Sequence, residues 1–586
     1  MLLQEQHGLF PRIFGKGDNA QRLADLLIRM RSESIADPSR RNKPLLPSTT
    51  IDSLIIIDRA IDFATPLLTQ LTYEGLLDET FHISNSQIEV STSIIGALPN
   101  TTTPPPAAGS SSQSAPSTTS TTPAPLRRRV VLSPTDPLYS TLRTSSISLI
   151  GPHLNRIARR LQSDFSLGPQ NNKTVSELRD FVTKLPGYQA EQQSLKTHTS
   201  LAEYVLNQTR QELWTKTLEV QQNLIAGTDL SSLIELIEEL IARDAPLQDV
   251  LRLLCLASVV NNGIRAKDLD NFKRLVVQAY GYQHIVTLSA LERMGLLLSS
   301  TSRTIGGVTS TLGASVGGLS SYIPGLNLSS NSSNNATSRA AKATSPAPSV
   351  RDGSTNAKSA PQTIPAPQTT LYNSLRKPLN LLIDTIDDAN PTDIAYTYSG
   401  YAPLSIRVIQ SLLQKAYLAA LTNSTSAAAR TKPANANTTN DALSAAARVP
   451  TDLSRSSEGW DTDGPVARYV KGATVDIAQM PDSHDRAGQV RSALIANTNG
   501  SVGGRGARTK KTTVLFFLGG VTYAEVAAVR LIGGQFADGG GWGDGGDDLG
   551  EEGAGMRKDL MIVTTGMIRG ESVVGAAVAA SEPRRI

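Results

Sequence analysis

The chain has 586 residues and a formal net charge of +4, too small for this length to indicate a large nucleic-acid or anionic-lipid interface, so we expect protein partners. Its single cysteine, Cys255, excludes an intramolecular disulfide framework and a cysteine-based zinc site, and fits a reducing cytoplasmic compartment. No apolar run approaches the roughly 20 residues of a membrane-spanning helix, so any membrane role is expected to come through partners.

The first predicted helix begins at Asp18, a residue type that caps helix N-termini. It ends near the Ser, Pro and Arg cluster at 36–41. Its apolar positions are spaced for one helical face, which carries Leu23, Leu26, Leu27 and Met30.

Four short apolar runs lack a polar–apolar alternation, which is typical of strands buried on both faces of a parallel sheet. These runs are Leu54–Ile57, Arg129–Leu132, Thr513–Leu518 and Leu560–Val563. Parallel neighbours need crossover helices, and Tyr523–Leu531 supplies one. Because the first and last runs lie hundreds of residues apart, the sequence predicts an α/β domain with a mostly parallel sheet, interrupted by a large all-α insertion.

The insertion has clear helical patterns. Ser232 and Glu235 have capping-box spacing, and apolar residues then recur with helical periodicity until Pro246. The next segment, LQDVLRLLCLASVV, is apolar nearly all round, so we expect a buried helix with Cys255 as a small core residue.

Four tracts have too little apolar content to offset the entropy of ordering, and we expect them to be disordered. They are residues 97–126, 299–370, 422–458 and 536–556. The Thr-, Ser- and Pro-rich part at 101–125 is either a phosphorylation region or a tolerated solvated insertion, and the second reading is favoured.

Motifs for enzyme chemistry are weak, so we predict no catalytic, cofactor-binding or metal-binding residues. Gly506–Thr513 resembles a phosphate-binding loop but lacks its second glycine and precedes a strand instead of following one. Asp58 and Arg59 end a predicted strand, with Asp62 following. They form either a ligand site at the strand ends or a buried ion pair that ties strand to helix, and the ion pair is favoured.

Seven segments in this order resemble the Sec/Munc (SM) family, specifically the vacuolar protein-sorting branch that supplies the SM subunit of the HOPS and CORVET tethers. The signature segment is Leu54–Glu79. The others are His7–Met30, Asp136–Leu154, Lys184–Glu203, Ala245–Leu297, Pro391–Arg407 and Val514–Ile532.

The resemblance implies the SM domain plan. Residues 1–135 and 401–586 are expected to form the two pieces of the second, α/β domain, and residues 136–400 the mainly helical third domain. The chain begins where the family's second domain begins, so we expect the first domain to be missing. Because that domain helps to line the cleft for the syntaxin-like Qa-SNARE, we expect weakened Qa-SNARE contact and retained R-SNARE contact.

The resemblance also implies a function. The chain would be a SNARE-binding chaperone and a HOPS or CORVET subunit, docked on a helical tether subunit, that promotes docking and fusion at endosome and vacuole or lysosome membranes. The third domain's helical hairpin, matched to Lys184–Ile241, would hold an R-SNARE helix. Candidate contacts there, which are otherwise an ordinary solvated face, are Lys184, Gln189, Gln192, Gln193 and Lys196. Signature residues interpreted as structural are Asp58, Arg59, Asp62, Thr72, Tyr73, Glu74, Tyr398, Gly400 and Tyr401.

Two alternatives stay open. The first is a shortened SM-like scaffold that binds the tether without templating SNAREs. The second is a nucleotide-binding α/β enzyme, against which the incomplete phosphate loop already argues.

Overall fold

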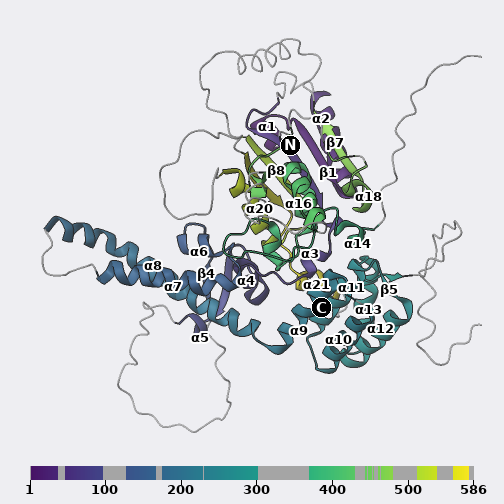
Figure 1. Ribbon diagram of the computed structural model, residues 1–586, viewed down its shortest axis with the longest axis horizontal. Helices are drawn as coiled ribbons and strands as arrows, with labels where there is room; N and C mark the ends of the chain where they lie inside the picture. Colours follow the sequence, from purple (N-terminus) through teal and green to yellow (C-terminus); the bar gives the residue numbers. More distant parts are fainter. Residues whose placement is uncertain are drawn as a thin grey trace, which may run out of the picture. The chain divides into compact units, whose positions relative to one another are not determined.

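Strand β2 (Ile51–Asp58) lies at the centre of the main sheet, and all eight of its residues are buried. In the computed structural model the five strands have the order β7-β1-β2-β8-β9 (Figure 1). β1 (Arg12–Lys16) and β8 (Lys511–Leu518) run parallel to β2, and β9 (Lys558–Thr564) runs parallel to β8. β7 (Thr474–Ala478) pairs antiparallel with β1. The sheet is therefore mostly parallel and is built from two distant pieces of chain.

The structure describes residues 2–36, 47–96, 127–166, 175–228, 230–300, 369–428, 443–444, 446–451, 453, 459–461, 463–479, 511–537 and 558–579. All of these residues belong to one compact unit made of 1–300 and 366–586. Within them, no helix has both the length and the apolar content needed to cross a membrane.

Three of the four predicted strands are confirmed in the main sheet as β2, β8 and β9. The fourth, Arg129–Leu132, is a strand as far as Val131, but its expected place in the parallel sheet was wrong. It belongs to β4 (Arg127–Val131), which pairs antiparallel with β3 (Gln87–Ser91) in a separate two-stranded sheet. Successive side chains of β4 alternate between exposed and half-buried, and Val131 is 61% exposed. A strand with one solvated face is typical of an antiparallel pair.

Helices cover both faces of the main sheet. α2 (Asp18–Ala36) packs on the face that carries Ile13 and Leu54. α15 (Leu404–Leu413) and the confirmed crossover helix α20 (Tyr523–Ala537) belong to the core on the opposite face. On α2, Ala20 and Ala24 are buried, whereas part of the apolar face seen in the sequence is solvated, because Leu26 is 49% exposed and Met30 40% exposed.

The insertion is helical, as predicted. It contains α6 (Pro137–Leu142), α7 (Ile147–Ser166), α8 (Val175–Thr209), α9 (Glu212–Ala226), α10 (Leu230–Ala242), α11 (Leu247–Val260), α12 (Ala266–Tyr280) and α13 (His284–Arg293). α11 is buried on nearly all sides and Cys255 is a core residue, as expected. The side chain of Ser232 lies outside the described residues, so the capping box stays a prediction.

Shorter elements complete the described fold. They are α1 (Leu2–His7), η2 (Arg59–Ile61), α3 (Ala64–Leu67), α4 (Tyr73–Phe81), α5 (Thr92–Ile95), β5 (Ile264–Arg265), β6 (Ser299–Ser300), α14 (Tyr372–Leu375), η3 (Ile394–Tyr398), α16 (Lys415–Ala428), α18 (Pro465–Tyr469) and α21 (Gly570–Ala579).

The expectation of disorder across the whole of 422–458 was wrong at several points. α16 continues to Ala428. Ala447 packs against Tyr417 and Leu418, and Leu453 is fully buried. Apolar residues scattered along a polar tract are enough to anchor it to the core. Residue Phe536 of the expected tract 536–556 is likewise buried at the end of α20. Residues 97–126, and 301–368 of the expected tract 299–370, lie outside the described residues.

Candidate functional site

The end of β2 carries the Asp58-Arg59 pair, and the two side chains do not bind each other. The Asp58 carboxylate caps η2, accepting hydrogen bonds from the backbone N–H of Ala60 and of Asn19, each at 3.0 Å. Arg59 instead donates from Nη1 to both carboxylate oxygens of Glu525 at 2.9 Å, and its Nη2 lies 3.3 Å from Asp62. The ion pair expected between Asp58 and Arg59 was therefore wrong in its acidic partner, because the buried arginine pairs with Glu525 and Asp62.

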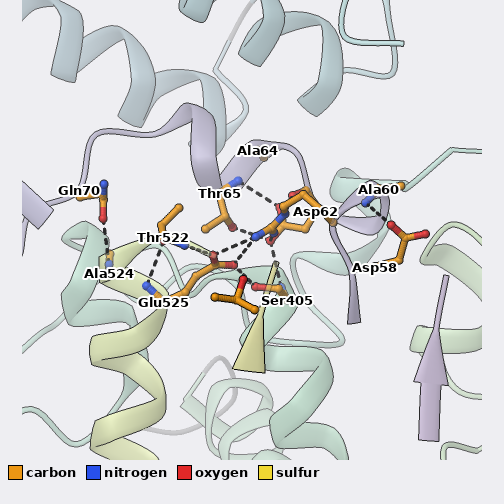
Figure 2. Close-up of polar contacts among 12 residues, drawn as sticks. Asp58, Ala60, Asp62, Ala64, Thr65, Gln70, Ser405, Thr522, Ala524 and Glu525 are labelled. Carbon is orange, nitrogen blue, oxygen red and sulfur yellow. Dashed lines mark hydrogen bonds and ion pairs between the residues drawn. The ribbon is translucent and has the colours of Figure 1, made fainter. Parts of the chain in front are cut away.

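Distant segments of the chain converge on these two carboxylates. Asp62 accepts hydrogen bonds from the Thr65 hydroxyl at 2.6 Å, the Tyr372 hydroxyl at 2.9 Å and the Ser405 backbone N–H at 3.0 Å. Glu525 accepts from the Thr522 backbone N–H at 2.9 Å and from the Ser405 hydroxyl. Figure 2 shows Asp62, Ser405 and Glu525 pointing toward one another. We name Arg59, Asp62, Ser405 and Glu525 the signature hub.

The signature hub is closed to solvent. Asp62, Ser405 and Glu525 have no exposed surface, and Arg59 is 5% exposed. Burial alone would lower the pKa of the Arg59 guanidinium. The charges of Glu525 and Asp62 more than offset this effect, so the pKa is raised overall and the arginine stays charged. Burial raises the pKa of Tyr372 well above its ordinary value, which keeps its hydroxyl a hydrogen-bond donor. The signature hub therefore links the end of β2, α15 and α20 through buried polar contacts, and its side chains are closed to a substrate from solvent.

The later signature residues hold α4 in place. The Thr72 hydroxyl caps α4 by accepting from the Gly75 backbone N–H at 3.3 Å. The Tyr73 hydroxyl lies 3.0 Å from Nδ1 of His198 in α8. Glu74 accepts from the Tyr139 hydroxyl at 2.7 Å and pairs with Arg530 of α20 at 2.6 Å.

The segment around Tyr398 joins the same buried region. The Tyr398 hydroxyl lies 3.1 Å from the hydroxyl of Thr522, and the two rings of Tyr398 and Tyr401 make an edge contact with centroids 6.2 Å apart. The Tyr401 hydroxyl lies 3.4 Å from that of Thr65. Gly400 between the tyrosines has φ +117°, a conformation that favours glycine.

The predicted SNARE-contact residues lie on α8 and are solvated. Gln189, Gln192, Gln193 and Lys196 are all exposed. The spacing of Gln189, Gln192 and Lys196 places them on one face of the helix. Lys184 also lies in α8, but its side chain is outside the described residues. The expected stretch Lys184–Ile241 covers α8, α9 and α10, whereas the long helices that pair side by side are α7 and α8 (Figure 1).

A second exposed surface, on and just before α13, was not predicted from the sequence. Tyr282 is 82% exposed, Ile285 44% and Val286 49%. Ile285 and Val286 lie in the first turn of α13 (His284–Arg293) and Tyr282 in the turn just before it, and we name these three residues the α13 apolar face. The apolar residues are visible in the sequence, but those of the buried α11 show that an apolar pattern does not tell a core face from an exposed one.

No metal site emerges from the described part of the chain. There, no group of three or more His, Cys, Asp or Glu side chains is arranged to hold a metal ion. The weak phosphate-loop motif Gly506–Thr513 lies outside the described residues up to position 510, and Lys511–Thr513 begin β8.

Curated proteins with similar sequences are named as vacuolar protein sorting-associated proteins. The rat vacuolar protein sorting-associated protein 33A is 29% identical over 541 residues, covering 92% of this chain and 66% of the relative. The fission yeast (Schizosaccharomyces pombe) vacuolar protein sorting-associated protein 33 is 28% identical over 579 residues, covering 98% of this chain and 71% of the relative. The chain thus spans about two thirds of the length of the curated relatives it matches.

Among solved structures, the SM protein Vps45 in complex with the Qa SNARE Tlg2 aligns with a TM-score of 0.49 and 12% identity, covering 99% of this chain and 67% of that chain. A model of the Sec1 family matches residues 1–576. Because that match spans nearly all of the sequence, and the relatives above match more than nine tenths of it, the chain belongs to the Sec1 family.

Proposed function

We propose that this chain is an SM-type SNARE-binding chaperone and a HOPS or CORVET tether subunit that promotes vesicle docking and fusion at endosome and vacuole or lysosome membranes. It would act as a binding protein without enzymatic turnover, cytoplasmic and held at the membrane by its partners. The vacuolar sorting relatives, similar over more than nine tenths of the chain, support this assignment. We also propose that residues 1–135 and 401–586 act as the α/β domain and residues 136–400 as the helical domain.

The α13 apolar face is the surface that we propose binds the tether subunit. Exposed apolar side chains that are close together in sequence supply the kind of surface that protein interfaces bury. Tyrosine is also enriched among the residues that dominate binding energy. A helical tether subunit would lay its own apolar stripe against Tyr282, Ile285 and Val286.

The exposed polar face of α8 supports the proposed binding of a SNARE helix. A SNARE helix held along Gln189, Gln192 and Lys196 would lose conformational freedom before it meets its partners, so less entropy would be lost on zippering. The face adds a cation and amide groups without an apolar patch, which suits weak, reversible binding. An R-SNARE helix is the expected occupant, together with a syntaxin-like Qa-SNARE as a second partner.

The test is titration calorimetry of the full chain with a tether-subunit fragment and, separately, with an R-SNARE motif peptide. We expect both to bind, and Ile285→Asp to abolish tether binding alone. Ile28→Asp on α2 is the matched control, since Ile28 is 38% exposed and Ile285 44% exposed. Tether binding without SNARE binding would favour the scaffold, and binding of neither would refute the proposal. A heat signal with ATP, GTP or NAD would favour the enzyme alternative.

A further inference from the structure

We propose that Tyr73, Asp136, Ser194 and His198 form a hairpin clamp that positions the exposed SNARE-contact face of α8. The inference rests on the proposed function, because it gives the buried Tyr73 and His198 and the partly buried Asp136 and Ser194 a role in presenting that face. None of the four contacts the partner directly, so they are positioning residues.

The contacts of the clamp join three elements. His198 and Ser194 lie four residues apart in α8 and face the same way. The Ser194 hydroxyl donates to Asp136 Oδ2 at 2.5 Å, and His198 Nε2 lies 3.4 Å from that oxygen. The other ring nitrogen of His198, Nδ1, lies 3.0 Å from the Tyr73 hydroxyl. The histidine is therefore held between α4 and the start of α6.

Each partner of His198 is itself fixed. Asp136 caps α6, because its Oδ1 accepts from the backbone N–H of Leu138 at 2.9 Å and of Tyr139 at 3.3 Å. Burial alone would raise the pKa of Asp136. The hydrogen bonds from His198 and Ser194 more than offset this effect and lower the pKa to about 2, so the carboxylate is charged. Tyr73 is fully buried at the first position of α4. The Tyr139 ring stacks on His198 with centroids 5.9 Å apart.

The clamp lies opposite the exposed face of the same helix. His198 is 3% exposed, whereas Lys196, two residues earlier, is solvated. Two residues correspond to a rotation of about 200° around an α-helix, so a buried contact at His198 directs Lys196 outward. Gln192 stands in the same relation to Ser194. Rotation or tilt of α8 at the clamp would therefore move the whole SNARE-contact face.

Contacts at other points keep the hairpin attached if the clamp is weakened. The Ser146 and Ser148 hydroxyls, at the start of α7, donate to Asp388 at 3.2 and 2.8 Å. Within the hairpin, Arg160 of α7 pairs with Glu191 of α8, which holds the two helices to each other. A clamp variant should thus remain folded while α8 samples a wider range of orientations.

The test uses Tyr73→Phe, which removes one hydroxyl and keeps the ring, and Asp136→Asn, which keeps a capping side chain but removes the charge facing His198. Tyr280→Phe is the matched control, because its hydroxyl also makes a hydrogen bond, to the Ala245 carbonyl at 2.6 Å, in the α10–α12 region. Spin labels at Ala190→Cys on α8, an exposed position, and Lys267→Cys on α12 report the orientation of α8. Cys255 is buried, so labelling is confined to the new cysteines.

We expect both clamp variants to broaden the distribution of spin-label distances and to weaken R-SNARE peptide binding about fivefold, the effect of one lost hydrogen bond. Tether binding and the Tyr280→Phe variant should stay within twofold of wild type. A distance distribution that remains as narrow as that of Tyr280→Phe overturns the clamp. If wild type binds no SNARE peptide, the proposed function fails, and the distance measurement still decides whether the clamp sets the orientation.

Discussion

The signature hub predicts a large stability loss for Glu525→Gln. This change removes the charge that faces Arg59 Nη1 from both carboxylate oxygens at 2.9 Å and leaves a guanidinium that is only 5% exposed. Breaking a buried ion pair on one side costs about 3–5 kcal/mol. Asp62 still lies 3.3 Å from Arg59, and glutamine keeps one acceptor oxygen, so we expect about 3 kcal/mol.

The measurement is urea denaturation followed by far-UV circular dichroism. Glu571→Gln is the matched control, because Glu571 also pairs with an arginine, Arg569 at 2.7 Å, but is 42% exposed. An exposed pair contributes about 0–1 kcal/mol, so the control should unfold nearly as wild type does. Equal losses in the two variants, or a loss below about 1 kcal/mol for Glu525→Gln, would refute the idea that the hub is a buried electrostatic tie.

Three further predictions follow from single buried residues. Burial lowers the pKa of Lys16 from its ordinary value to about 8. Between pH 8 and the pKa of 10.5 in the unfolded chain, the unfolded chain binds more protons than the folded one, so the free energy of unfolding should rise with pH. Lys16→Met lacks this titrating group. In urea titrations, the stability of wild type relative to Lys16→Met should therefore rise by up to about 3 kcal/mol between pH 8 and 10.5. Gly17→Ala should destabilise the chain by at least about 2 kcal/mol in the same assay, since Gly17 has φ +109° and an added Cβ would lie 2.3 Å from the Asp58 Cβ; a neutral result would contradict this geometry. Burial raises the pKa of the Cys255 thiol, so a thiol reagent should label it only in urea; rapid labelling of the native chain would mean that α11 is not a core helix.

The strands that the sequence predicts correctly each contain an uninterrupted apolar run. The runs are Leu54–Ile57 in β2, Val514–Leu518 in β8 and Leu560–Val563 in β9, although β9 is only partly buried and Met561 is 46% exposed. β1 was missed because Gly15 and the terminal Arg12 and Lys16 leave only two apolar residues between them. β7 was missed because Asp476 interrupts a short edge strand and pairs with Arg12 of β1 at 2.7 Å, a contact that forms only after the strands meet.

The site was predictable in location but not in its contacts. The Asp58-Arg59 dipeptide suggested a local ion pair, yet the arginine reaches Glu525, 466 residues later, and no spacing rule connects them. The exposed position of Gln189, Gln192 and Lys196 agrees with the solvated face expected from their polarity. The α13 apolar face needed the three-dimensional structure, because only burial separates a docking stripe from a core stripe.

The arrangement of the main sheet has a consequence for synthesis. β2 emerges early from the ribosome with eight residues that end up buried, but its neighbour β8 and the partner of Arg59 are made only after more than 450 further residues. At 5–20 residues per second this delay is roughly 20–90 s. During that time a strand whose residues are all buried in the folded chain has one of its two neighbours missing. Newly made chain should therefore need protection by general chaperones, and shortening the translation delay should raise the soluble yield.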